Sequence, residues 1–293
     1  MSLRGKKPEV IEKRLKVLFY GAPGVGKTTA AIQFPKPYLI DTEKGSENDQ
    51  YVKLINESGG LVFKTADFDD FTTEVRSLLN EKHEYKTLII DPLTILYKDL
   101  LDKCSKNRIS DKDPDGTAFG GHYSVANKKM DQLLNLLLLL DMNVIITSHS
   151  KNEYGANLTV LGQTFDCYKK LDYLFDLSLE VQKRGKERVA IIRKTRIENF
   201  PDGEVFPFSY KEIAKRYGHE MLEKEAKSQE LASLDQVIEV KRLIELLKLP
   251  EKTTDKWLKK GDAENWDEMS KKSMESIIIH LQTIINGKKG AAA

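Results

Sequence analysis

One eight-residue segment constrains this chain more than any other part of its 293-residue sequence. Residues 21–28 read Gly-Ala-Pro-Gly-Val-Gly-Lys-Thr and match the pattern G-x-x-x-x-G-K-[ST]. The apolar run Lys16–Tyr20 precedes the motif and Thr28–Phe34 can be helical, so the strand and helix that the motif requires flank it. The segment therefore predicts a loop that wraps its backbone N–H groups around the phosphates of a nucleotide.

The motif also predicts individual roles. Lys27 is expected to reach the β- and γ-phosphates of ATP, and Thr28 to place its hydroxyl on Mg²⁺. Asp91 ends an apolar run and is the natural second magnesium residue, although it can also be an ordinary acid at a strand end. The predicted cofactor-binding residues are Gly21, Ala22, Pro23, Gly24, Val25, Gly26, Lys27, Thr28 and Thr29.

Short apolar runs alternate with helical spacing along the first half of the chain. This pattern predicts an α/β fold with a parallel sheet and crossover helices. The predicted strands there are Lys16–Tyr20, Tyr38–Ile40, Leu61–Lys64, Lys86–Asp91 and Met142–His149, and Phe71–Glu81 is a predicted helix. From Tyr173 on, period-two alternation predicts antiparallel strands at Tyr173–Gln182, Glu187–Lys194 and Glu204–Phe208, which make the sheet mixed.

The remainder predicts a small helical appendage. We expect an ATPase core at 1–210, a helical linker at 211–230, a helical domain at 231–286 and a disordered tail at 287–293. Ser233 and Gln236 have the spacing of a capping box that opens the appendage. No apolar run approaches the ~20 residues of a membrane helix, and the two cysteines lack the spacing of a zinc site. A net charge of +2 argues neither for nor against a nucleic-acid partner.

P-loop proteins differ in the source of the carboxylate that activates water. Pro92 follows Asp91, so the adjacent glutamate of the AAA+ type is absent. Glu43, at the end of the strand that follows the phosphate loop and its helix, is the other common source. The guanine-binding motif Asn-Lys-x-Asp and the ABC motif Leu-Ser-Gly-Gly are both absent.

The sequence resembles the RecA-like ATPases, and within them most closely the phage ATPases of single-strand annealing and recombination (Sak type). The similar segments are Gly21–Thr28, Ile40–Glu43, Leu88–Asp91, the strand end at His149, and Ile192–Arg196. The resemblance implies that Glu43 orients the attacking water and that His149 senses the γ-phosphate. It further implies that Lys194 and Arg196 reach the phosphates of a neighbouring subunit.

Each of these implied roles has a plain structural alternative. Glu43 can cap a helix near Ser46, and His149 can be a hydrogen-bonded structural residue. RecA itself carries an amide at the position of His149. Lys194 and Arg196 can belong to a solvated strand face.

Two segments after the central strands are expected to be flexible loops that bind single-stranded DNA. The first, Lys103–Tyr123, and the second, Ser150–Thr164, combine basic residues for phosphates with aromatic residues for base stacking. The candidate DNA-binding residues are Lys103, Lys106, Arg108, Lys151 and Tyr154. The alternative is a pair of mobile surface loops.

Together these features predict an ATP- and Mg²⁺-dependent ATPase that binds single-stranded DNA and acts in recombination or annealing as a homo-oligomer, a ring or a filament. A recombination or single-strand-binding protein is a candidate partner of the helical appendage, and the expected location is the cytoplasm, of the host if the protein is phage-encoded. A nucleotide-switched adaptor, such as a helicase loader, is the alternative. A small-molecule kinase is disfavoured because no arginine-rich lid follows the central strands.

Overall fold

The computed structural model describes residues 13–109, 113, 115–155, 157, 159–227, 231–261, 263 and 265–290. Most of the described strands form one sheet. They are β1 (Lys16–Tyr20), β2 (Pro37–Asp41), β3 (Leu61–Lys64), β4 (Thr87–Asp91), β5 (Asn143–Ser148), β8 (Leu177–Arg184), β9 (Glu187–Thr195) and β10 (Val205–Pro207). Their order is β10-β9-β8-β1-β5-β4-β2-β3. The pairs from β8 to β3 are parallel and the pairs β8–β9 and β9–β10 are antiparallel. This arrangement confirms the predicted α/β class with a mixed, mainly parallel sheet.

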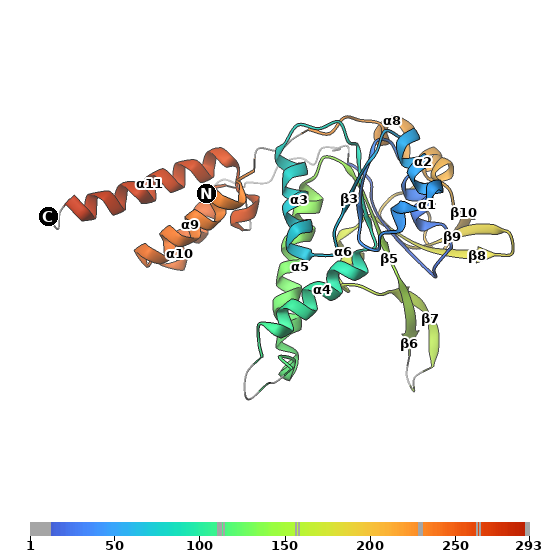
Figure 1. The fold of residues 1–293 in the computed structure, drawn as a ribbon, viewed down its shortest axis with the longest axis horizontal. Helices are drawn as coiled ribbons and strands as arrows, with labels where there is room; N and C mark the ends of the chain where they lie inside the picture. Colours follow the sequence, from blue (N-terminus) through green and yellow to red (C-terminus); the bar gives the residue numbers. More distant parts are fainter. Residues whose placement is uncertain are drawn as a thin grey trace, which may run out of the picture.

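Helices cover both faces of the sheet (Figure 1). They are α1 (Lys27–Ala31), α2 (Asp49–Glu57), α3 (Phe68–Asn80), α4 (Leu93–Lys106), α5 (Gly121–Leu139), α6 (Leu171–Leu174), α7 (Tyr210–Tyr217) and α8 (His219–Leu222). Successive strand residues point to opposite faces. Accordingly Leu18 packs with α3, α4 and α5, whereas Val17 and Phe19 pack with α1, α2, α7 and α8. Burial on both faces explains why these strands are continuous apolar runs.

Three local predictions were wrong. Residues 173 and 174 lie in α6, and the predicted strand begins only at Leu177. Lys103 and Lys106 belong to the last turn of α4, because Leu96, Leu100 and Cys104 continue its buried stripe. The segment Ser150–Thr164 is not a loop: β6 (Ser150–Tyr154) and β7 (Val160–Phe165) form a two-stranded hairpin.

The predicted linker contributes to the core. Ser209 caps α7 by accepting a hydrogen bond from Glu212 N, and Ile213, Ala214 and Leu222 are fully buried against the sheet. A helix with an apolar stripe is stabilised by burying that stripe, so α7 and α8 pack on the core rather than bridge two bodies. Residues 228–230 of the predicted linker lie outside the described residues.

The C-terminal helices have an apolar cluster of their own. They are α9 (Leu234–Leu247), α10 (Glu251–Lys260) and α11 (Lys271–Gly290). The capping box of Ser233 and Gln236 is confirmed. α11 continues to Gly290, the predicted disorder of 287–293 stays a prediction, and 291–293 lie outside the described residues.

The helical unit extends beyond α3 (Figure 1) and is attached to the core through polar contacts. Arg76 on α3 forms an ion pair with Asp267, and both side chains are largely buried. Asn135 Nδ2 on α5 donates to Glu268 Oε1 at 3.0 Å. Whether residues 231–286 also fold as a separate domain stays a prediction.

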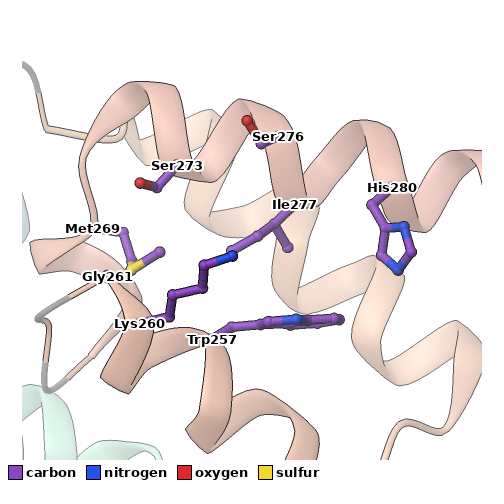
Figure 2. Close-up of a pocket in the computed structure, with 8 residues that line it drawn as sticks. All are labelled: Trp257, Lys260, Gly261, Met269, Ser273, Ser276, Ile277 and His280. Atoms are coloured by element: carbon purple, nitrogen blue, oxygen red, sulfur yellow. The ribbon is translucent and has the colours of Figure 1, made fainter.

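A groove of about 310 Å³ lies between α10 and α11 (Figure 2). Trp257 and Ile277 line the groove, and the side chain of Lys260 extends across it. Gly261, at the end of α10, packs closely on Met269, which precedes α11, since a Cβ atom there would lie 2.2 Å from Met269 Sδ.

In the part of the chain that the structure describes, no helix is long and apolar enough to cross a membrane. Cys104 and Cys167 are both buried and neither forms a disulfide.

Lys16, the first residue of β1, carries a buried amino group. Its Nζ donates to Leu140 O and Met142 O, both at 2.8 Å. Burial penalises the charged form and lowers the pKa of Lys16 to about 7, against the opposing effect of Asp141. The folded protein therefore holds fewer protons on this group than the unfolded chain between pH 7 and the ordinary lysine pKa of 10.5.

This pKa predicts how stability depends on pH. The free energy of unfolding should gain up to about 1.4 kcal/mol per pH unit from Lys16 between pH 7 and 10, because the unfolded state binds the additional proton. Lys16→Met should remove that gain. Urea denaturation of both proteins at pH 7, 8 and 9 measures it, and parallel pH profiles would show that Lys16 is not buried as described.

Candidate functional site

The phosphate loop connects β1 to α1 at the carboxyl end of the parallel sheet, and two of its glycines are required by its geometry. A Cβ atom on Gly21 would lie 2.3 Å from Val181 O on the neighbouring strand. Gly26 has a φ of +94°, in the left-handed region that favours glycine. The curved shape of the loop therefore requires glycine at positions 21 and 26.

Lys27 bends back over this loop. Its Nζ donates to Gly21 O at 2.8 Å and to Ala22 O at 3.0 Å. Burial lowers the pKa of Lys27, while the charges of Asp91 and Glu43 oppose that shift. The ammonium group thus lies between the curved loop and two carboxylates, where a phosphate chain would meet it.

Asp91 joins three elements at the carboxyl edge of the sheet. Thr28 Oγ1 donates to Asp91 Oδ2 at 2.7 Å, and Thr147 at the end of β5 donates to Asp91 Oδ1. Burial raises the pKa of Asp91, and the hydrogen bonds from both threonines and the charge of Lys27 oppose that shift.

The two predicted magnesium residues therefore lie side by side. Hydroxyl and carboxylate oxygens are hard ligands, which suit Mg²⁺. Magnesium in nucleotide sites usually has only one or two protein ligands, because phosphate oxygens and water supply the others. Thr28 and Asp91 fit that pattern, and among the described residues no cluster of three acidic, His or Cys side chains provides a separate cage.

Glu43 and His149, from different strand ends, are in contact. His149 Nε2 lies 3.0 Å from Glu43 Oε1, and both side chains are partly exposed. His149 N donates to Thr94 Oγ1 at 3.1 Å, which ties the end of β5 to the start of α4. The structure thus brings together the predicted water-orienting carboxylate and the predicted sensor.

Asp41 supports this arrangement, and the sequence reasoning did not single it out. Its carboxylate accepts hydrogen bonds from Glu43 N at 3.1 Å, Gly45 N at 3.2 Å and Ser46 N at 2.9 Å. Asp41 is almost fully buried. An acid at a strand end followed by Gly45 and Ser46 was the signal that could have identified it.

Lys194 and Arg196 lie at the other end of the sheet. Arg196 N donates to Asp176 O, and Asp176 N donates to Lys16 O at the first residue of β1. The side chain of Lys194 donates to Phe175 O, and Arg196 Nη2 donates to Tyr173 O at 2.6 Å. The structure does not bring these two residues to the phosphate loop of their own subunit.

Arg193, which precedes Lys194 in the sequence, lies beside the phosphate loop. Its Nη2 is 2.6 Å from Glu180 Oε2, and Glu180 is only 2% exposed. Arg193 and Glu180 line an open cleft of about 510 Å³ together with Ala22–Val25. A strand bulge between Ser178 and Leu179 offsets the pairing of β8 with β9, so sequence alternation alone could not place Arg193.

The five candidate DNA-binding residues have different surroundings. Lys103 Nζ is held by the carboxylates of Asp67, Asp69 and Asp99, at 2.6, 3.3 and 3.0 Å. Lys106 and Arg108 are exposed at the end of α4.

The other two candidates lie on the β6–β7 hairpin. Lys151 Nζ lies 3.2 Å from Asp166 Oδ1. Tyr154 is 56% exposed. The hairpin, the end of α4 and the start of α5 project from the same side of the core (Figure 1).

The phosphate loop at the carboxyl end of a parallel sheet, with Thr28 and Asp91 beneath it, defines a P-loop nucleotide-binding protein. Residues 13–198 match the family described as AAA domain, and the chain belongs to this family of ATPases. No curated protein matches the chain. Among solved structures the chain is similar to the RadB recombinase, with 18% identity and a TM-score of 0.46 over 67% of this chain and 86% of that one.

The site predicts that binding and hydrolysis can be separated. Glu43→Gln should retain ATP binding and lose most hydrolysis, ~10²-fold or more, because the amide fits but no longer accepts a proton. Lys27→Ala should lose both, because the phosphates lose their cation. Isothermal titration and phosphate release measure the two effects. Normal turnover of Glu43→Gln would place the essential carboxylate elsewhere.

Proposed function

We propose that this chain is a RecA-type, ATP-dependent single-stranded DNA-binding ATPase that acts in recombination or annealing as a multimer, as the Sak-type phage proteins do. The contact of His149 with Glu43 carries the proposal. Ser150, the next residue, begins the β6–β7 hairpin, so one histidine adjoins both the nucleotide site and the candidate DNA segment.

Hydrolysis would use the side chains described above. Lys27 would hold the β- and γ-phosphates, and Thr28 and Asp91 would hold Mg²⁺. A bound Mg²⁺ would supply positive charge that neutralises the phosphates. Glu43 orients a water and accepts its proton while the water oxygen bonds to the γ-phosphorus and the bond to ADP breaks. Inorganic phosphate then leaves.

The nucleotide state would reach the hairpin through His149. When a γ-phosphate is present, the imidazole of His149 can hydrogen-bond either to that phosphate or to Glu43. A change from one partner to the other would move the ring. Because His149 N is fixed to Thr94, movement of the ring is passed mainly to the chain that follows, where β6 begins. This coupling supports a nucleotide-controlled grip on a ligand at the hairpin.

Single-stranded DNA is the ligand that the projecting side chains suit best. Exposed Tyr154 offers a face for base stacking, and Lys151, Lys106 and Arg108 offer cations for phosphates. Lys103 contributes less to this proposal, because three carboxylates already surround its amino group.

DNA binding through the hairpin is directly testable. Tyr154→Ala should weaken binding to a fluorescent oligonucleotide about five- to hundredfold, since stacking contributes roughly 1–3 kcal/mol per base. Tyr154→Phe should bind normally, because it keeps the ring. Single-stranded DNA should also stimulate ATP hydrolysis of the wild type, and binding should weaken steeply with salt.

An adaptor that acts on a protein is the second candidate, and the hairpin also favours it. Tyr154, Val160 and Leu161 are 56, 55 and 68% exposed, and such side chains suit a protein contact. If oligonucleotides neither bind nor stimulate hydrolysis, while Tyr154→Ala leaves ATP binding intact, the adaptor replaces the DNA-binding ATPase as the proposed function.

Multimer formation rests on the placement of Lys194 and Arg196. Both lie at the amino end of β1, away from the phosphate loop of their own subunit, so a catalytic role requires a second copy. The side chain of Arg196 is 54% exposed and can reach outward. The helical unit 231–286 then remains available to a recombination or single-strand-binding protein.

Complementation tests this role in trans. Arg196→Ala should bind ATP but lose much of its turnover, because a basic residue delivered in trans contributes up to ~10³-fold. Mixing Arg196→Ala with Glu43→Gln should restore part of the activity, measured as phosphate release at rising protein concentration. Arg184→Ala, a matched change at the other end of the β8–β9 hairpin, should behave as wild type. An inactive mixture together with a strictly monomeric wild type would exclude the trans contact.

A further inference from the structure

Arg188, near the start of β9, packs directly against the phosphate loop. A Cβ atom built on Gly26 would lie 2.9 Å from Arg188 Cδ and 3.0 Å from Arg188 Nε. Gly26 immediately precedes Lys27, so the guanidinium lies at the phosphate loop of the same subunit. Arg188 is not among the nucleotide-binding residues that the sequence predicts.

The fold holds this side chain in place from two directions. Alternate residues of a strand share a face, so Arg188 points to the side of Ala190 and Ile192, which pack with α1. Phe208 N donates to Arg188 O at 2.8 Å and fixes the backbone there. The position of Arg188 relative to the loop is therefore a property of the β8–β9 hairpin and its neighbour β10.

The charge of Arg188 is uncompensated within the described residues. Its guanidinium makes no ion pair or side-chain hydrogen bond with any of them, whereas Arg193 is paired with buried Glu180. Arg184, on the same hairpin, donates to Gln182 Oε1 at 3.4 Å. An arginine beside a phosphate loop and without a carboxylate partner is available to bind an anion with two parallel N–H donors.

We propose that Arg188 binds the phosphate chain of the nucleotide held in its own subunit. The inference rests on the proposed function, because it uses the same ATP site. It adds a cation in cis that differs from Lys27 inside the loop and from Arg196, which is proposed to act on another subunit. Arg188 is a ligand-binding residue here, and it takes no proton and breaks no bond.

The experiment measures equilibrium binding with two probes. A fluorescent ATP analogue reports the affinity for nucleotide, and inorganic tripolyphosphate, added as a competitor, reports the affinity for a phosphate chain without a base. Arg188→Gln should weaken both about tenfold or more, since hydrogen bonds to charged groups contribute that much. Arg188→Lys should retain part of the affinity. Arg184→Gln, the matched control on the same hairpin, should leave both affinities unchanged.

Two outcomes would overturn the inference. The first is wild-type affinity of Arg188→Gln for both probes. The second is a loss of ATP affinity with unchanged tripolyphosphate affinity, which would place the contact on the nucleoside. Thermal unfolding checks that each variant is folded. If Arg188→Gln is unstable, the affinity of Arg188→Lys for the two probes, compared with that of the wild type, tests the inference instead.

Failure of the proposed function gives a different result. In that case single-stranded DNA leaves the ATPase of the wild type unchanged, while the loss of affinity in Arg188→Gln persists.

Discussion

The rest of the site depends on the hydrogen bonds that the carboxylate of Asp91 accepts. It accepts hydrogen bonds from Thr28 in the phosphate loop and from Thr147 at the end of β5. Its own carbonyl accepts from Thr42 N at the end of β2. One residue thus brings three strand ends and the phosphate loop to a common point, where Mg²⁺ and phosphates would replace hydrogen bonds within the protein.

A second layer of contacts holds Glu43 and His149, the proposed reactive groups, around that point. Asp41 orders the turn that presents Glu43, and Thr94 holds the backbone of His149. Pro92 follows Asp91, so in the proposed site the water-orienting carboxylate comes from the end of a different strand. Ser150, the residue after His149, begins the hairpin, so the proposed nucleotide site and the projecting surface share one short segment.

The basic residues around the phosphate loop differ in whether a carboxylate neutralises them. Arg193 is neutralised by buried Glu180, whereas Arg188 packs against Gly26 without a carboxylate. Lys194 and Arg196 lie near the amino end of β1, at the opposite end of the sheet from the phosphate loop, although they follow Arg193 closely in sequence. Basic residues that lie close together in the sequence therefore have three different surroundings in the structure. Neighbouring strand residues face opposite sides of the sheet, and a bulge shifts the register of β8 and β9.

The sequence by itself determined the phosphate loop, the strand that ends at Asp91 and the alternation of strands and helices, because each of these depends on residues close together in the chain. Only the tertiary structure decided that Ser150–Thr164 pairs as a hairpin, that α7 packs on the core, and that Arg188 touches Gly26. Those features depend on contacts between distant segments. The local composition of these segments is typical of a loop or a linker. They form a hairpin or a packed helix because distant segments of the fold bury them or hydrogen-bond to them.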